Sequence, residues 1–135
     1  MFLAYASASL YLYLDHRVLH LRWRAGVTGA GFAQGLTAAT TLTQAHQLQG
    51  WVTLNHHVYP LAPAEQLCLQ QQALLPLHQT SLQRVAIILP AAAFQGTPHE
   101  SLITACRPLV SYQIQYFSRL APACRWVQTG VPATG

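Results

Sequence analysis

A chain of 135 residues that is 52% hydrophobic and only 7% charged can bury a core, and this composition excludes an intrinsically disordered protein. The net charge of +4 results from seven Arg, no Lys and three acidic residues. The arginines are scattered singly along the sequence, apart from the pair Arg22 and Arg24. Nucleic-acid binders concentrate their basic residues on one face or arm, so we expect no nucleic-acid partner. So few charges indicate a surface that is unusually neutral or that another subunit covers in part.

The first predicted element is an antiparallel hairpin of two strands, Leu10–Leu14 and Val18–Ala25. The second strand alternates with period 2, so its side chains divide between two faces. One face carries Leu19, Leu21 and Trp23, and the other carries His20, Arg22 and Arg24. We expect the face with His and Arg to be solvated or to face a partner.

A long helix is predicted after the hairpin, with Thr28 as its N-cap and its end near Gln47. Its expected buried stripe consists of Phe32, Leu36, Ala39 and Thr43, with Leu42 beside them. The strand Trp51–Leu54 follows, and its lack of alternation indicates burial on both faces.

The second helix is expected to begin at Pro63, a residue suited to the first helical position, and to end or kink at Pro76. Its expected apolar stripe is Leu67, Leu74 and Leu75, and its expected exposed residues are Gln70, Gln71 and Gln72. The remaining predicted elements are a central parallel strand Arg84–Pro90, a helical segment Pro98–Cys106, a strand Tyr112–Phe117 and a short helix Pro122–Val127.

The resulting order ββαβαβαβα predicts an α/β fold in a single domain, residues 1–135, with an ordered core from about residue 10 to residue 127. Strand–helix–strand units imply parallel neighbours joined by right-handed crossovers, and the hairpin adds an antiparallel edge. We therefore expect a mixed sheet of about five strands with helices packed on it.

Five segments in this order resemble the small bacterial STAS-like (SpoIIAA-like) domains, in particular uncharacterised single-domain proteins common in Bacteroidetes. They are the opening hairpin, the helix after Gly26-Val27-Thr28, the strand Gly50–Leu54, the helix end Leu74-Leu75-Pro76-Leu77, and Arg84–Pro90 followed by Phe94. Anti-sigma-factor antagonists of STAS type carry a phosphorylatable Ser or Thr at the start of the helix after the third strand. The corresponding stretch, Asn55–Glu65, contains neither. The resemblance therefore implies an interaction or sensing module without that phosphorylation switch.

The stretch from Gly50 to Pro63 begins as a buried strand and continues through a loop to the start of a helix. Ligands of open α/β sheets bind where such strands end. We therefore expect any ligand site at this exit and at the loop after Pro90, formed by Asn55, His56, His57, Tyr59 and Phe94.

No catalytic or metal-binding constellation is evident. Seven histidines include no i, i+4 pair on a predicted helix, and the adjacent His56 and His57 point to opposite sides of an extended segment. The chain has only three acids and no nucleotide-binding loop or nucleophile motif. We predict no catalytic residues, no metal ligands and no cofactor.

Three cysteines, odd in number and without a CxxC pair, favour free thiols in a cytoplasmic protein. The apolar opening Met1–Leu14 lacks the basic segment of a signal peptide, and no stretch has the apolar length of a membrane span. We therefore expect a cytoplasmic protein without membrane insertion.

Aromatic and Arg side chains with few other charges are the composition of interface cores. The outer face of the hairpin carries such a set, Tyr11, Tyr13, His20, Arg22 and Arg24, and we expect an interface there or at an edge strand. The leading interpretation is a non-catalytic STAS-like interaction or sensing module that forms a homodimer or binds an unknown protein partner. A small-ligand or lipid carrier is the alternative, and a metal-dependent enzyme is the third.

Overall fold

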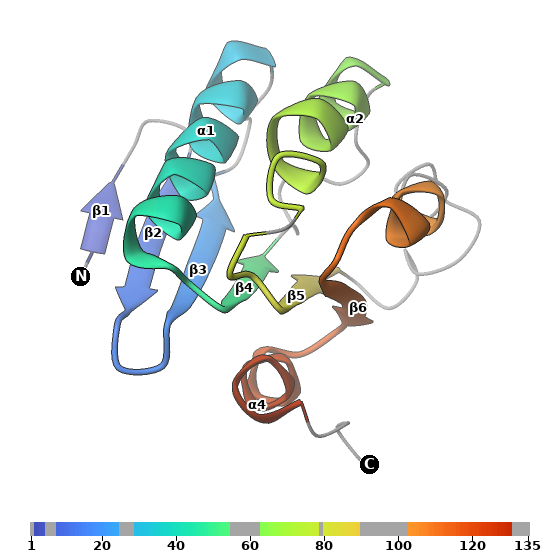
Figure 1. The fold of residues 1–135 in the computed structure, drawn as a ribbon. Coiled ribbons are helices and arrows are strands. Elements are labelled where there is room, and N and C mark those ends of the chain that lie inside the picture. The colour runs from blue at the N-terminus through green and yellow to red at the C-terminus, as the bar shows by residue number, and fades with distance from the viewer. Residues whose placement is uncertain are drawn as a thin grey trace.

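Within the described residues, six strands form one sheet in the order in which they occur along the chain (Figure 1). The computed structural model describes residues 2–4, 8–24, 29–54, 63–78, 80–89 and 103–130. The strands are β1 (Phe2–Ala4), β2 (Ala8–Tyr13), β3 (Val18–Trp23), β4 (Gly50–Leu54), β5 (Arg84–Ile88) and β6 (Gln113–Phe117). Strands β1 to β3 are antiparallel, and β3 to β6 are parallel. This confirms the predicted α/β class with an antiparallel hairpin and parallel βαβ units.

Strand β1 was not predicted, and it adds a sixth strand to the about five that the sequence predicts. Phe2 pairs with Tyr11 and Ala4 with Ser9, so β1 adds an antiparallel edge beside β2. Its three residues are too few to show a period-2 pattern. Pairing with β2 makes these residues a strand.

The predicted faces of the hairpin are confirmed. Leu19, Leu21 and Trp23 are buried, whereas Arg22 and Arg24 are exposed. The register aligns Tyr11 with His20 and Leu12 with Leu19, so each face of the hairpin carries side chains from both strands.

Helices α1 (Gly29–His46) and α2 (Pro63–Leu69) lie side by side on one face of the sheet (Figure 1). The predicted stripe of α1 is confirmed, because Phe32, Leu36, Ala39 and Thr43 are all buried. Its predicted N-cap, Thr28, lies outside the described residues. A helical turn at residues 103–106 continues into η3 (Arg107–Leu109), and Ile103 and Cys106 join the same core.

A π turn, η1 (Gln70–Leu74), follows α2 directly, and the Leu75 N–H donates to the Gln70 carbonyl at 3.0 Å. A π turn takes more residues than an α turn, so it rotates the residues before it relative to those after it. Leu74 is buried and Leu75 half-buried, but Leu67 is 52% exposed. The prediction of Leu67 in the buried stripe was therefore wrong, as was that of an exposed Gln70, which is half-buried.

Helix α4 (Leu120–Thr129) lies on the opposite face and packs on β4, β5 and β6 (Figure 1). Gly50 permits this close approach, because a Cβ at that position would lie 2.1 Å from Val127 Cγ1. The helix ends at Gly130, whose φ of 74° is left-handed and whose N–H donates to the Trp126 carbonyl. Arg84 donates to the Val127 carbonyl at 3.3 Å, which places a cation at the helix C-terminus.

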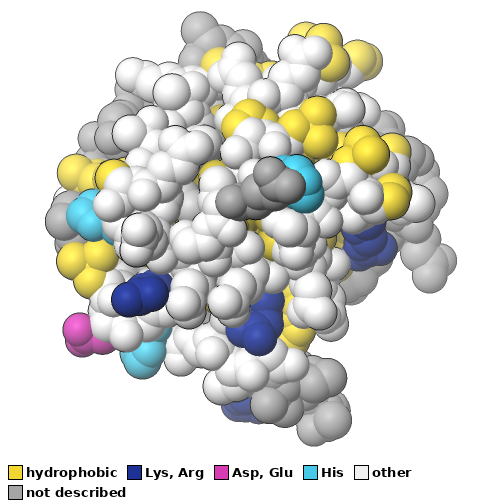
Figure 2. Space-filling view, in the orientation of Figure 1, with side chains coloured by type: hydrophobic (Ala, Val, Ile, Leu, Met, Phe, Trp, Pro, Cys, Tyr) yellow, Lys and Arg dark blue, Asp and Glu magenta, His cyan; other side chains and the backbone are white. Residues whose placement is uncertain are grey.

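The surface on the α1 and α2 side carries few charges. Figure 2 shows Arg side chains that are separated from one another by wide neutral areas. This distribution agrees with a charged fraction of only 7%.

Candidate functional site

The five residues predicted to bind a ligand lie outside the described residues. They are Asn55, His56, His57, Tyr59 and Phe94. Their grouping stays a prediction. The described residues show two other features: a sheet surface beside α4 and a cavity beneath α1 and α2.

The first feature is the part of the sheet beside α4 that β1, β2 and β3 form. Alternation along these strands turns Leu10, Leu12 and Leu21 toward α1, and the intervening side chains toward the opposite side. We call this set the outer hairpin face: Phe2, Ser9, Tyr11, Tyr13, His20 and Arg22. Arg24 follows directly after β3 and is exposed.

Aromatic rings contact one another across the strands of this face. The Phe2 and Tyr11 rings lie 4.8 Å apart, and the Tyr13 and His20 rings lie 4.6 Å apart, between centroids. Phe2 is nevertheless 55% exposed and Tyr13 45% exposed. The structure thus brings four of the predicted interface residues onto one open surface, with Arg24 at its end.

The charge of the outer hairpin face is positive at one end. Arg22 and Arg24 lie where β3 ends, whereas Asp15 lies in the exposed turn between β2 and β3. Asp15 is the one acid whose side chain is described. Arg17 lies in the same exposed turn as Asp15, so the charges of the turn cancel and the positive charge is concentrated at the β3 end.

His20 also contacts α4. Its Nε2 lies 3.7 Å from Cys124 Sγ, between β3 and the helix. Sequence reasoning found no partner for Cys124, because 104 positions separate the two residues and no local pattern connects them.

A Cys beside a His suggests nucleophilic chemistry, but burial opposes it here. Burial lowers the pKa of His20 and raises the pKa of the Cys124 thiol, so both groups are held neutral. A reactive cysteine needs the thiolate, which a cationic environment favours and burial disfavours. The contact supports packing of α4 on β3 rather than an activated thiol.

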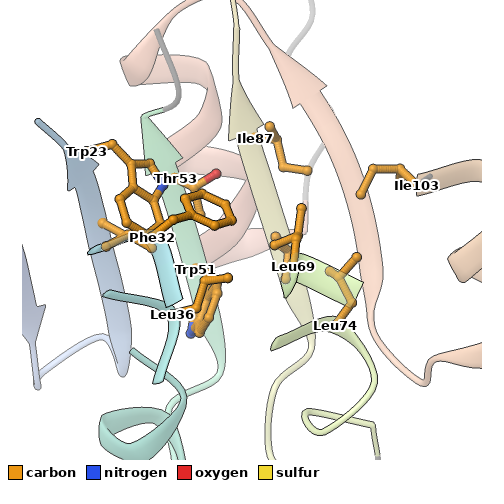
Figure 3. Close-up of a pocket in the computed structure, with 11 residues that line it drawn as sticks. Trp23, Phe32, Leu36, Trp51, Thr53, Leu69, Leu74, Ile87 and Ile103 are labelled. Atoms are coloured by element: carbon orange, nitrogen blue, oxygen red, sulfur yellow. The ribbon is translucent and has the colours of Figure 1, made fainter. Parts of the chain in front are cut away.

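The second feature is a cavity of about 30 Å³ between the sheet and the helices above it (Figure 3). Its walls come from three strands, α1, α2, η1 and Ile103. The lining residues are Leu21, Trp23, Phe32, Leu36, Trp51, Thr53, Leu69, Leu74, Val85, Ile87 and Ile103. The lining is almost wholly apolar, and Trp23, Thr53 and Ile87 place it toward the carboxyl ends of the strands.

Thr53 is the exception in this lining. Only 7% of the residue is exposed, and its Oγ1 has no hydrogen-bond partner in the described part of the chain. The register explains why, since its neighbours across the sheet are Leu21 and Ile87. Trp51, two residues earlier, is satisfied, because its Nε1 donates to Thr43 Oγ1 at 2.6 Å.

The described residues also bear on two other function classes, metal-dependent enzymes and membrane-spanning proteins. No three His, Cys, Asp or Glu side chains among them lie close enough to hold a metal ion. None of the described helices has the length and apolarity to cross a bilayer.

Comparisons with protein-family models, with curated proteins and with solved structures found no match to this chain. The structure by itself shows an α/β fold, a mixed sheet with an N-terminal hairpin and parallel βαβ units.

Proposed function

We propose that this protein is a non-catalytic interaction or sensing module of STAS-like type, and that it forms a homodimer through the outer hairpin face. One observation carries the proposal: α4 packs mainly on β4 to β6 and reaches β3 at His20, while the aromatic side chains of Phe2 and Tyr13 remain exposed. Antiparallel sheets do expose one face to water, but that face is ordinarily polar. Phe2, Tyr11 and Tyr13 make this one apolar and aromatic.

The residue types of the face match those of protein interfaces. Interface cores are enriched in aromatic residues and Arg and depleted in Lys, Glu and Asp. The outer hairpin face contains three aromatic side chains, His20 and Arg22, and the chain has no Lys at all. Only 7% of the residues are charged, so much of the surface interacts weakly with water. A second copy of the same chain would cover part of this surface.

One orientation of the two copies brings Asp15 close to arginines of the partner. Two-fold symmetry makes an interface self-complementary, so a contact of one residue with a different residue of the other copy occurs twice. Tyr11 and His20 pair near the middle of the hairpin. A two-fold axis that lies between the facing hairpins, over this pair and perpendicular to the strands, places the turn with Asp15 and Arg17 over Arg22 and Arg24 of the other copy. Asp15 then meets an arginine at two places in the dimer.

Two alanine variants test this proposal. Tyr13→Ala removes an exposed aromatic ring from the outer hairpin face, and Leu67→Ala removes a similarly exposed apolar side chain from α2. Sedimentation equilibrium at micromolar concentration should show a dimer for the wild type and for Leu67→Ala. Tyr13→Ala should weaken the dimer by about tenfold or more, as central aromatic residues of interfaces do.

A wild-type chain that stays monomeric at these concentrations contradicts the homodimer. Equal weakening by the two variants contradicts the assignment of the face. Circular dichroism melts of both variants control for unfolding.

A further inference from the structure

We infer that the cavity beneath α1 and α2 is a binding site for an uncharged, oxygen-bearing hydrocarbon, such as a short alcohol. In this assignment the ligand's oxygen pairs with Thr53 Oγ1, and its carbon atoms contact Trp23, Phe32 and Ile87. The site goes beyond the proposed interaction function and lies on the opposite side of the sheet from the outer hairpin face.

The position of the cavity is the first observation. Thr53, Trp23 and Ile87 lie toward the carboxyl ends of three neighbouring strands that run in parallel. Ligands of open α/β sheets bind at this edge. The wall contributed by Leu69 and Leu74 includes the π turn, and π turns are frequent at functional sites.

The unpaired hydroxyl of Thr53 is the second and independent observation. Buried polar atoms in folded proteins are nearly always hydrogen-bonded, and an exception needs an explanation. Figure 3 shows the Thr53 oxygen among the rings and aliphatic groups that line the cavity. A ligand oxygen would supply the bond that the described residues do not.

The lining sets the chemical class of the ligand. No Arg, Lys, His, Asp or Glu is among the described lining residues, and a buried charge without a partner is strongly unfavourable. A water molecule in a cavity is held by two to four polar partners, and a lining of mostly carbon atoms holds it poorly. A molecule with one oxygen and a hydrocarbon body matches both properties.

The volume limits the size of the ligand. An apolar cavity of about 150 Å³ holds one benzene molecule, and this cavity is about 30 Å³. By that ratio it holds about one non-hydrogen atom, so a hydroxyl fits and each further carbon atom requires Leu69 and Leu74 to move. Among n-alcohols, we expect ethanol to bind with a small displacement of these two side chains and longer chains to bind more weakly.

The three tryptophans give the assay an internal control. Trp23 and Trp51 line the cavity, whereas Trp126 belongs to α4 and packs on the other face of the sheet. In ¹H–¹⁵N NMR spectra of the full chain, ethanol should shift the indole signals of Trp23 and Trp51 in a saturable way. The Trp126 signal should stay unchanged.

Thr53→Val separates a specific site from a solvent effect. It should weaken ethanol binding by about tenfold, the loss expected when one hydrogen bond is removed. Thr41→Val, at an exposed position on α1, should bind ethanol as the wild type does. Tyr13→Ala should do so too, which distinguishes failure of this site from failure of the dimer.

Three results would overturn the inference. They are no shift of the Trp23 and Trp51 signals, equal and unsaturable shifts of all three indoles, and undiminished ethanol binding by Thr53→Val. In the first case the cavity holds at most a water molecule.

Discussion

Replacing Thr53 by Val should stabilise this protein, although the residue lies in its core. Thr53 Oγ1 is buried without a partner in the described part of the chain, and a buried hydroxyl of this kind costs about 1–3 kcal/mol. Val keeps the β-branched shape and puts a methyl group where the hydroxyl was. The adjoining cavity of about 30 Å³ accommodates the larger methyl without overpacking.

We expect a gain of about 1–2 kcal/mol in the free energy of unfolding. In a domain of this size that corresponds to a rise in Tm of roughly 3–6 °C. Urea denaturation followed by circular dichroism measures the change as a higher midpoint with an unchanged slope.

Thr43→Val is the matched control, because the chemical change is identical but the hydroxyl is fully used. Thr43 Oγ1 accepts from Trp51 Nε1 at 2.6 Å and donates to the Ala39 carbonyl at 2.8 Å. Its loss leaves the buried indole N–H unpaired, so we expect a destabilisation of about 1–3 kcal/mol.

The two variants should therefore change stability in opposite directions. If Thr53→Val destabilises the protein as Thr43→Val does, the Thr53 hydroxyl has a partner and the reasoning is wrong. In this reasoning the Thr53 hydroxyl lowers the stability of the fold but strengthens binding of the ligand inferred for the cavity. Such a trade-off between stability and function is common in proteins.

Three further predictions concern the dimer, the packing of α4 and the response to acid. Asp15→Arg and Arg24→Asp should each weaken the dimer about tenfold, and the double variant should restore it, as sedimentation equilibrium would show. Gly50→Ala should destabilise the chain by about 1–3 kcal/mol in urea, because its Cβ would lie 2.1 Å from Val127 Cγ1. Burial lowers the pKa of His20 in the folded state, so the unfolded chain binds the proton more tightly. Stability should therefore fall as the pH drops below about 6.5, the ordinary pKa of histidine, and His20→Gln should reduce this fall.

Each of the three has an outcome that contradicts it. A double charge variant no better than the single ones argues against the proposed orientation. Wild-type stability of Gly50→Ala would mean that α4 does not pack closely on β4. Identical pH profiles of the wild type and His20→Gln would place His20 in a solvated environment.

Local patterns determined the faces of the elements. Alternation in the hairpin predicted that Leu19, Leu21 and Trp23 are buried and that Arg22 is exposed, because side chains of a strand point to opposite faces whatever it packs against. The stripe of α1 was predictable for the same reason, since its apolar residues recur with the helical period. The predicted interface residues Tyr11, Tyr13, His20 and Arg22 share a surface because they occupy one face of paired strands.

Contacts between distant segments explain the features that short-range sequence patterns did not predict. β1 is a strand because β2 pairs with it, and Leu67 is exposed because a π turn changes the phase of the helix. The sequence order of the strands is also their order in the sheet, and only this arrangement brings Cys124 to His20.

The cavity shows the same division between sequence and structure. The lack of alternation in Trp51–Leu54 predicted that Thr53 belongs to a strand buried on both faces. Only the tertiary structure surrounds its hydroxyl with Leu21, Ile87 and Phe32 and leaves it unpaired. Hydrogen-bond satisfaction depends on atoms from distant segments, so it cannot be predicted from local propensity.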